Sequence, residues 1–325
     1  MSAVIQLHAP NQPTMVHNMV VASPAMRSLL STAERVAQSS LPILLRGAAG
    51  TGKELLARAI HKWSKRANAP FQKIHCATIT SPVELLGAVG GAVPGIERSR
   101  SGKFALAEGG TLYLDEVGDL SMALQAQLLR VLEDRSYMPV GAGKARWADI
   151  RLIAGSRHSL EQLVQQGKLR DDLMYRIQVL PLELPELVLR DGGVHALAMH
   201  FIDKNNRRDE RQIEGISDAV LDLFNRYRWP ANIRELQNVI EYAFAVGDGA
   251  ELTIDELPST FSKDSEQTLS TQPSGLTLDQ LDRRRLLSAL SQSGGRRSEA
   301  AEILGVSRTT LWRKLRHHNL LSQSA

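Results

Sequence analysis

A glycine-rich loop between an apolar run and a helical stretch is the feature that most narrows the folds open to this chain. The apolar run covers residues 42–45, and the helical stretch covers residues 54–64. The loop between them, residues 47–54, reads GAAGTGKE. A strand, a glycine-rich turn and a helix in this order let backbone N–H groups and the helix N-terminus surround a phosphate. The order therefore predicts a phosphate-binding loop (P-loop) in an α/β domain.

The loop supplies the first set of candidate nucleotide-binding residues. Lys53 adds a point charge near the outer phosphates. The position after this lysine is usually Ser or Thr, whose hydroxyl binds Mg²⁺, but here it is Glu54. A glycine-rich turn without a ligand is the alternative explanation of the loop taken alone. The candidates are Gly47, Ala48, Ala49, Gly50, Thr51, Gly52, Lys53 and Glu54.

A second apolar run, residues 111–114, leads directly into Asp115 and Glu116. A strand that ends in two carboxylates brings one of them beside a phosphate-bound Mg²⁺ and the other to a place where it can polarise an attacking water. We therefore predict that Asp115 is the metal partner and that Glu116 is the catalytic base. Two surface acids at the end of a strand are the alternative.

The fold class follows from the alternation of apolar and helical segments. Further apolar runs lie at 150–154 and 179–182, and further helical stretches lie at 122–133 and 160–166. Strands separated by helices of this length predict an α/β fold, with a parallel sheet and helices on both of its faces.

Beyond residue 190 the strand signals stop and helical stretches remain, which predicts a helical subdomain appended to the α/β core. A polar segment rich in Ser, Thr and Pro follows it and is typical of a linker. The predicted helices cover 194–204, 217–227 and 233–246. The predicted organisation is an N-terminal extension (1–18), an α/β core (19–190), a helical subdomain (191–257), a linker (258–275) and a C-terminal domain (276–325).

The basic charge of the chain is concentrated at its C-terminal end. Residues 276–325 contain nine Lys or Arg against four Asp or Glu, whereas residues 1–275 contain 30 basic and 31 acidic residues. A basic excess confined to one small module is expected when that module touches nucleic acid. The single cysteine, Cys76, excludes an internal disulfide, and no apolar run approaches the ~20 residues of a membrane helix. We therefore expect a cytoplasmic protein without membrane contact.

Residues 296–318 have the pattern of a helix-turn-helix, preceded by a leucine-containing amphipathic stretch at 278–290 that suggests pairing into dimers. Ala300 and Ala301 allow close helix contact, and Ser307 can cap the second helix. A basic three-helix module that binds no DNA is the alternative. The candidate DNA-binding residues are Arg297, Arg308, Thr309, Thr310 and Arg313.

Five segments together resemble the AAA+ domain of bacterial enhancer-binding proteins, the ATPases that remodel sigma-54 RNA polymerase. The segments are GTGKE (50–54), GGTLYLDEVGDL (109–120), QAQLLRVLED (125–134), LRDDLMYRI (169–177) and YRWPANIRELQNVIE (227–241). The resemblance runs from about residue 19 to residue 257. The C-terminal helix-turn-helix is similar to the Fis-type module that ends many of these proteins. That family also carries Glu after the P-loop lysine, so Glu54 supports the interpretation of the loop as a P-loop.

The resemblance implies an AAA+ core with a helical lid that binds ATP and Mg²⁺ between subunits of a ring, commonly a hexamer. It makes Arg170 and Arg176 the arginines that reach the γ-phosphate of the neighbouring subunit, and Ser156 and Arg234 residues that sense the nucleotide. Solvated helix arginines and a structural salt bridge are the alternatives for these arginines. The implied partners are an enhancer-like DNA site and sigma-54 RNA polymerase.

The sequence departs from this family at several positions. His75 stands where the family has an Asn that pairs with the catalytic Glu. An imidazole at this position can still bond Glu116, but with a different reach and a pH-dependent charge. The loop that touches the sigma factor, usually Gly-Ala-Phe-Thr-Gly-Ala, lacks its aromatic and threonine. It consists of Gly91, Ala92, Val93, Pro94, Gly95 and Ile96. The chain also starts almost directly with the AAA+ domain, so we expect control by a separate regulatory protein, by the level of expression or by a partner subunit.

The sequence therefore predicts an ATP-hydrolysing, DNA-binding transcriptional regulator of the sigma-54 activator type. One alternative is a nucleotide-dependent DNA-binding regulator whose altered loop does not activate sigma-54 polymerase alone. Another is a metabolic P-loop kinase with a basic tail, against which the arginine positions and the helix-turn-helix both argue.

Overall fold

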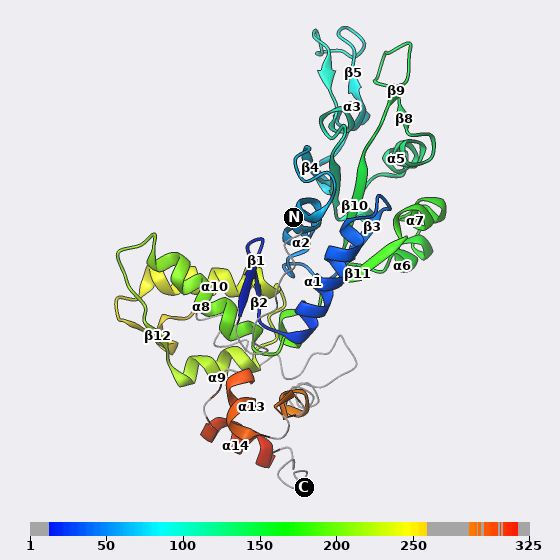
Figure 1. The fold of residues 1–325 in the computed structure, drawn as a ribbon. Helices are drawn as coiled ribbons and strands as arrows, with labels where there is room; N and C mark the ends of the chain where they lie inside the picture. Colours follow the sequence, from blue (N-terminus) through cyan, green and yellow to red (C-terminus); the bar gives the residue numbers. More distant parts are fainter. Residues whose placement is uncertain are drawn as a thin grey trace. The chain divides into compact units, whose positions relative to one another are not determined.

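The computed structural model describes residues 13–258, 286–290, 292–293, 296–304, 306 and 308–317. These residues form two compact units (Figure 1). The core unit contains residues 17–19 and 28–184. The helical unit contains the described residues of 13–16, of 20–27 and from 185 onward. The predicted linker (258–275), except for Pro258, lies outside the described residues, as do the first twelve residues of the chain.

The core unit is built on a five-stranded sheet in the order β11-β3-β10-β7-β4, and all four neighbouring pairs are parallel. Its strands are β3 (Ile43–Arg46), β4 (Phe71–His75), β7 (Thr111–Asp115), β10 (Arg151–Ser156) and β11 (Leu180–Glu183). The prediction of a parallel sheet is thus confirmed. β4 was not predicted, because Gln72, Lys73 and His75 interrupt its apolar residues.

Helices cover both faces of the sheet. Figure 1 shows α1 (Pro24–Ala37) and α2 (Lys53–Trp63) on the opposite side of the sheet from α5 (Met122–Asp134), α6 (Leu160–Gln165) and α7 (Asp171–Ile177). Alternate residues of β7 are buried against the two layers, since side chains of successive strand residues point to opposite faces. Leu112 and Leu114 share a hydrophobic cluster with Leu124 and Leu128 of α5, whereas Tyr113 lies outside that cluster.

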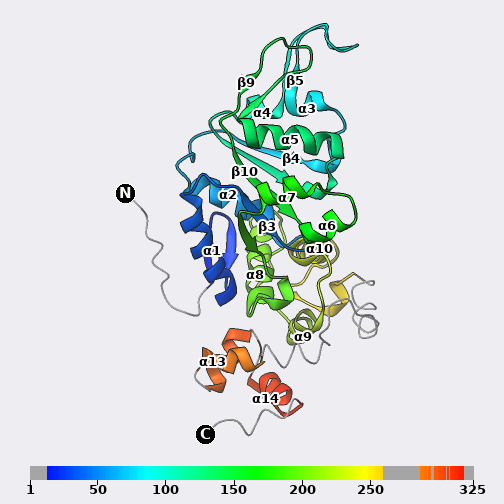
Figure 2. The same ribbon diagram turned by 90° about the vertical axis from the view of Figure 1, so that its right-hand side faces the viewer.

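Two short hairpins project from the same end of the core unit, and both ribbon views show them side by side (Figures 1 and 2). One hairpin pairs β5 (Gly87–Ala88) with β6 (Arg100–Ser101) and is flanked by α3 (Pro82–Leu86) and α4 (Lys103–Leu106). The other pairs β8 (Ser136–Tyr137) with β9 (Arg146–Trp147). Val140 joins the hairpins, because its C=O accepts from Val89 N–H at 3.0 Å and its N–H donates to Gly87 C=O at 2.9 Å.

The helical unit contains the three predicted helices as α8 (Gly193–Asn206), α9 (Asp218–Arg226) and α10 (Asn232–Val246). Trp229, Phe224 and Phe201 belong to its buried cluster. One detail corrects the sequence analysis: a short parallel pair, β12 (Gly215–Ile216) with β13 (Glu251–Leu252), interrupts the helical pattern. The remaining elements are β1 (Thr14–Val16), β2 (Met19–Val21), η3 (Leu187–Leu189) and η4 (Ile254–Glu256).

The C-terminal residues form α13 (Arg297–Leu304) and α14 (Arg308–His317). The two helices pack on each other and on helical residues 286–290 through Leu286, Ala289, Ala300, Ala301, Leu311 and Leu315. The close contact predicted for Ala300 and Ala301 is confirmed. Ser307 and residues 278–285 lie outside the described residues. Among the described helices, none combines the length and the apolar character of a membrane span.

Candidate nucleotide site and interaction surfaces

The P-loop connects β3 to α2 and ends in the N-cap of that helix. Gly50 and Gly52 adopt positive φ angles of 76° and 100°, and Gly52 is the N-cap. Left-handed backbone of this kind favours glycine. The N–H of Gly47 donates to the C=O of Ser156 at 3.1 Å, which ties the start of the loop to the end of β10. The loop therefore presents the N-terminus of α2 at the carboxyl edge of the sheet.

Lys53 is held at the centre of this loop. Its side chain is 6% exposed, and its Nζ lies 2.7 Å from Gly47 O, 3.2 Å from Ala48 O and 3.0 Å from Oε1 of Glu116. The structure therefore brings the P-loop lysine and the predicted catalytic base into direct contact. A phosphate that binds here competes with two carbonyls and one carboxylate for the same ammonium group.

Glu116 follows β7 in a left-handed conformation, with φ 57° and ψ 66°. It leads into η2 (Val117–Asp119). This conformation is costly for a residue with a Cβ, and such residues cluster at functional sites. Oε2 of Glu116 accepts a hydrogen bond from the backbone N–H of Arg157 at 2.9 Å. Because Oε1 of Glu116 contacts Lys53, both oxygens of the Glu116 carboxylate are held in place beside the P-loop.

His75 contacts Asp115 and not Glu116, the other carboxylate that an imidazole at this position could have bonded. Its Nδ1 lies 3.3 Å from Oδ2 of Asp115. The reason is the register of the parallel pair, which places His75 beside Asp115 at the ends of β4 and β7. Glu116 has already turned away in its left-handed conformation and points to Lys53. After His75 the chain enters η1 (Cys76–Thr78).

Asp115 has two further polar neighbours, one on its own strand β7 and one on β4. Its Oδ1 accepts from the Tyr113 hydroxyl at 3.0 Å, and its Oδ2 lies 3.6 Å from Nζ of Lys73. Burial, and then the negative charge of Asp115, raise the pKa of Tyr113, so the phenol remains a donor at neutral pH. A Cβ at Gly155 would lie 2.7 Å from the Tyr113 hydroxyl, which explains the glycine there.

Lys73 and Tyr113 were not among the predicted site residues. Lys73 also pairs with Glu54, and Arg58 of α2 pairs with the same carboxylate at 2.8 Å. The alternation in FQKIH, which puts Phe71, Lys73 and His75 on one face of β4, is the sequence signal that would have found Lys73.

The arrangement suits a Mg²⁺ ion that arrives with a nucleotide. Proteins usually hold this ion with one or two carboxylates together with phosphate oxygens and water. Asp115 provides such a carboxylate beside the P-loop. Across the described residues, no three His, Cys, Asp or Glu side chains gather into a metal site of their own.

The remaining predicted nucleotide contacts lie on β10, on α7 and on α10. Ser156 is buried and its hydroxyl donates to His158 C=O at 2.7 Å. Arg170, the N-cap residue of α7, pairs with Asp172 at 2.7 Å, and Arg176 lies 3.5 Å from Glu133. The two arginine side chains are 38% and 55% exposed, so both are available at the surface of the core unit. Arg234 is exposed in the first turn of α10 in the helical unit, and its role stays a prediction.

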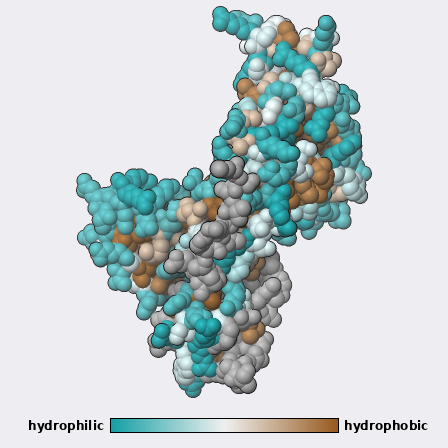
Figure 3. Space-filling model, in the orientation of Figure 1, coloured by the Kyte–Doolittle hydropathy of each residue, from teal (hydrophilic) through white to brown (hydrophobic). Residues whose placement is uncertain are grey.

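The predicted sigma-contact loop lies at the tip of the β5–β6 hairpin. The N–H of Ile96 donates to the C=O of Val93 at 3.0 Å. The two residues between them are Pro94 and Gly95, and Gly95 has a φ angle of 82°. Proline followed by a glycine with positive φ is the pattern of a type II turn. A second bond, from Gly91 N–H to Ile96 C=O at 2.8 Å, closes the loop at its base. Hydrophilic and hydrophobic residues are mixed at this end of the core unit (Figure 3).

Of the predicted DNA-binding residues, Arg297 on α13 and Arg308 on α14 are exposed. Thr309, Thr310 and Arg313 belong to α14, but their side chains lie outside the described residues. Trp312 on the same helix is 47% exposed, and the guanidinium of Arg316 lies 5.4 Å from the centre of its ring.

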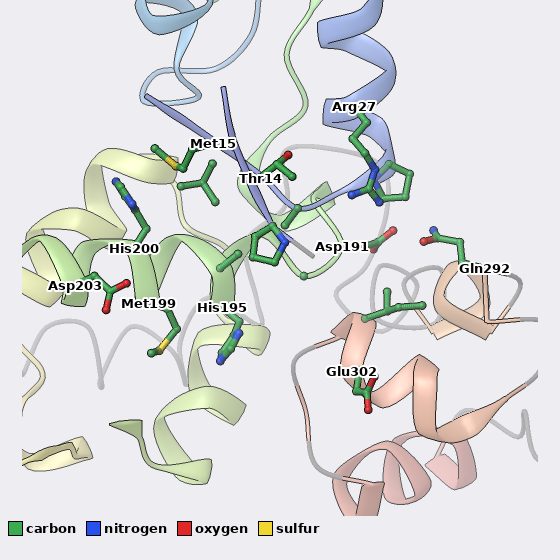
Figure 4. A pocket seen from close by; sticks show the side chains of 17 residues that line it. Thr14, Met15, Arg27, Asp191, His195, Met199, His200, Asp203, Gln292 and Glu302 are labelled. Atoms are coloured by element: carbon green, nitrogen blue, oxygen red, sulfur yellow. The ribbon is translucent and has the colours of Figure 1, made fainter. Parts of the chain in front are cut away.

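A cavity of about 350 Å³ lies in the helical unit (Figure 4). Its lining includes Met15 from β1, Arg27 from α1, and His195, Met199 and His200 from α8. None of the predicted nucleotide-binding residues lines it. Burial lowers the pKa of His195, so this imidazole is neutral near pH 7.

Three family models match successive parts of the chain. A sigma-54 interaction domain matches residues 19–183, an AAA+ ATPase lid domain matches residues 189–274, and a bacterial regulatory protein domain of the Fis family matches residues 277–318.

Individual relatives give the same result. The transcriptional regulatory protein ZraR of Escherichia coli K12 is 39% identical over 303 residues, which cover 91% of this chain and 68% of ZraR. The alginate biosynthesis transcriptional regulatory protein AlgB of Pseudomonas putida is 38% identical, over 92% of this chain and 66% of AlgB. A crystal structure of NtrX from Brucella abortus in complex with ATP matches with a TM-score of 0.69 and 33% identity, over 93% of this chain and 69% of that chain.

Proposed function

Since this chain belongs to the family of sigma-54 activators, with an AAA+ core, an AAA+ lid and a Fis-type helix-turn-helix, we propose that it hydrolyses ATP in a ring assembly to remodel sigma-54 RNA polymerase. The observation that carries hydrolysis is the 3.0 Å contact between Lys53 of the P-loop and Glu116 at the end of β7. None of the comparisons favours the alternative of a nucleotide-dependent DNA-binding regulator that does not activate sigma-54 polymerase alone.

The residues of the core unit divide the chemistry of phosphoryl transfer among them. Backbone N–H groups of the P-loop hold the phosphates, and Lys53 offsets their negative charge. Asp115 would hold Mg²⁺, which when bound neutralises charge on the β- and γ-phosphates. Glu116 orients the attacking water and accepts its proton. Arg170 and Arg176 act on the nucleotide of a neighbouring subunit, so hydrolysis depends on assembly.

Replacing Glu116 with glutamine is expected to lower ATP turnover on the order of 10²-fold while nucleotide binding persists, because the amide accepts no proton from water. Lys53→Ala is expected to impair binding itself. Steady-state phosphate release and binding of a fluorescent nucleotide separate the two effects. Glu34→Gln on α1 is the matched control and should behave like the unmodified protein. Unchanged turnover in Glu116→Gln would remove Glu116 from the role of base.

We assign DNA contact to the domain that begins near residue 276, which carries the basic excess of the chain. Arg297 and Arg308, exposed on the two helices of the helix-turn-helix, are suited to phosphates or base edges. An enhancer-like site is the proposed target. A cytoplasmic location completes the proposal.

The Val93–Ile96 turn leads to a prediction about sigma-54 activation. Val93 offers less apolar contact than an aromatic ring, and loss of an aromatic hot spot commonly costs about 2 kcal/mol, or a factor of about 30 in affinity. Introducing Phe at position 93 together with Thr at position 94 is therefore expected to raise sigma-54 binding by up to about 30-fold. A purified transcription assay and a sigma-54 binding assay would measure the gain.

The single variant Val93→Phe keeps Pro94 and separates the aromatic ring from the turn. ATP turnover without sigma-54 should be the same in all three proteins, which controls for damage to the core unit. If the unmodified protein already binds sigma-54 as tightly as the double variant does, the aromatic ring is dispensable in this chain.

A further inference from the structure

A lysine of β4 links the two acidic residues that flank the predicted metal position. Nζ of Lys73 lies 2.5 Å from Oε2 of Glu54 and 3.6 Å from Oδ2 of Asp115. Glu54 directly follows the P-loop lysine, and Asp115 ends the central strand β7. One ammonium group therefore sits between the carboxylates contributed by the two halves of the nucleotide site.

The backbone that carries Lys73 is fixed by packing. Lys73 is paired with Tyr113 in the β4–β7 register. Two residues earlier, the ring of Phe71 is stacked on that of Tyr113 with centroids 6.3 Å apart, and the guanidinium of Arg58 lies 4.9 Å from the centre of the same Phe71 ring. These contacts hold β4 against α2 and β7, so the position of the ammonium group is set by regular structure and not by a loop.

The other charged groups around the two carboxylates do not make Lys73 redundant. Glu54 has a second cation in Arg58, but Arg58 contacts only Oε1, whereas Lys73 contacts Oε2. Asp115 has His75 at 3.3 Å and the uncharged hydroxyl of Tyr113 at 3.0 Å. Lys73 alone among these groups contacts both carboxylates.

We propose that Lys73 is a positioning residue that bridges Glu54 and Asp115 and weakens the attraction of the site for Mg²⁺. The ammonium group offsets part of the negative charge of the two carboxylates that would attract a divalent cation, and it also repels that cation directly. The bridge also turns Glu54 toward β4, so that Glu54 is held by cations of the protein. The chain then requires more Mg²⁺ to bind nucleotide than it would without this charge. The proposal rests on the proposed nucleotide site.

The test is the Mg²⁺ concentration that half-saturates binding of ADP to the full-length protein, measured by calorimetry or with a fluorescent ADP. Lys73→Met keeps the length of the side chain and removes its charge, and we expect the half-saturating Mg²⁺ concentration to fall about tenfold. Glu54→Gln removes one carboxylate, so that Lys73 pairs with Asp115 alone. The half-saturating Mg²⁺ concentration should therefore rise. The double variant restores the net charge and should return to within about twofold of the unmodified protein.

Two further variants control the experiment. Lys73→Arg keeps the charge and should stay close to the unmodified protein. Lys65→Met removes an exposed lysine after α2 and should have no effect. Thermal unfolding reports whether Lys73→Met folds. If it does not fold, the direction in which Glu54→Gln changes the half-saturating Mg²⁺ concentration tests the proposal.

An unchanged or increased Mg²⁺ requirement in folded Lys73→Met, or an unchanged requirement in Glu54→Gln, would overturn the bridge while leaving the nucleotide site intact. Failure of the unmodified protein to bind ADP at any Mg²⁺ concentration would instead overturn the proposed function.

Discussion

The alanine variants of Arg170 and Arg176 are each expected to lose on the order of 10³-fold in ATP turnover, because an arginine that reaches a transferring phosphoryl group from a neighbouring subunit offsets charge that develops in the transition state. Both side chains are exposed and pair with acidic residues of their own chain, Asp172 and Glu133. Exposed ion pairs contribute little to stability, so the variants should fold normally. Steady-state phosphate release at a protein concentration that saturates assembly measures the loss.

Mixing variants shows whether these arginines act between subunits. A Glu116→Gln subunit lacks the base but supplies both arginines, and an Arg170→Ala subunit has the reverse defect. An equimolar mixture should therefore regain part of the lost turnover. Arg35→Ala on α1 is the control for loss of an arginine in the core unit. A rate per subunit that is independent of protein concentration, with no recovery on mixing, would contradict action in trans.

A chain that ends at residue 257 is expected to lose sequence-specific DNA binding, by about 10³-fold or more in affinity for its site, because specific complexes exceed non-specific ones by at least that factor. Its ATP turnover should remain, since the P-loop, Asp115 and Glu116 all belong to the core unit. Footprinting or fluorescence anisotropy at a fixed salt concentration measures the binding. Specific protection of DNA by the shortened chain would show that the recognition surface lies elsewhere.

A point variant refines the same prediction. Arg308→Ala should weaken binding and reduce the slope of log affinity against log salt by about one if the lost contact is to a phosphate. Arg226→Ala on α9 removes an exposed arginine outside the helix-turn-helix and should leave the slope unchanged.

The sheet was predictable where the sequence of a strand is a continuous apolar run and not where polar residues interrupt it. β3, β7 and β10 are almost entirely buried, so their apolar runs predicted them. β4 carries Gln72, Lys73 and His75 at the edge of the sheet, and its pattern resembles a loop as much as a strand. The two-residue strands of the hairpins are too short to leave a periodic signal, and each forms only by pairing with its partner across the connecting loop.

The candidate site was predictable as far as it depends on chain order. A parallel strand followed by a glycine-rich loop, and a second strand that ends in acids, must meet at one edge of the sheet. The structure accordingly brings Lys53 and Glu116 together. Which carboxylate contacts His75 depended instead on the left-handed conformation of Glu116. No residue type at that position predicts this conformation. Lys73 was overlooked because its segment was not predicted to be a strand, so nothing placed it beside β7.

The contact between Lys53 and Glu116 couples the proposed phosphate-binding group to the proposed base. A triphosphate is a more negatively charged partner for the ammonium group than a single carboxylate is. A ligand shifts such an equilibrium only through its unequal affinity for the two arrangements. Under the proposed function, a nucleotide would therefore compete with Glu116 for Lys53, and the free energy of breaking this ion pair would be subtracted from the free energy of nucleotide binding.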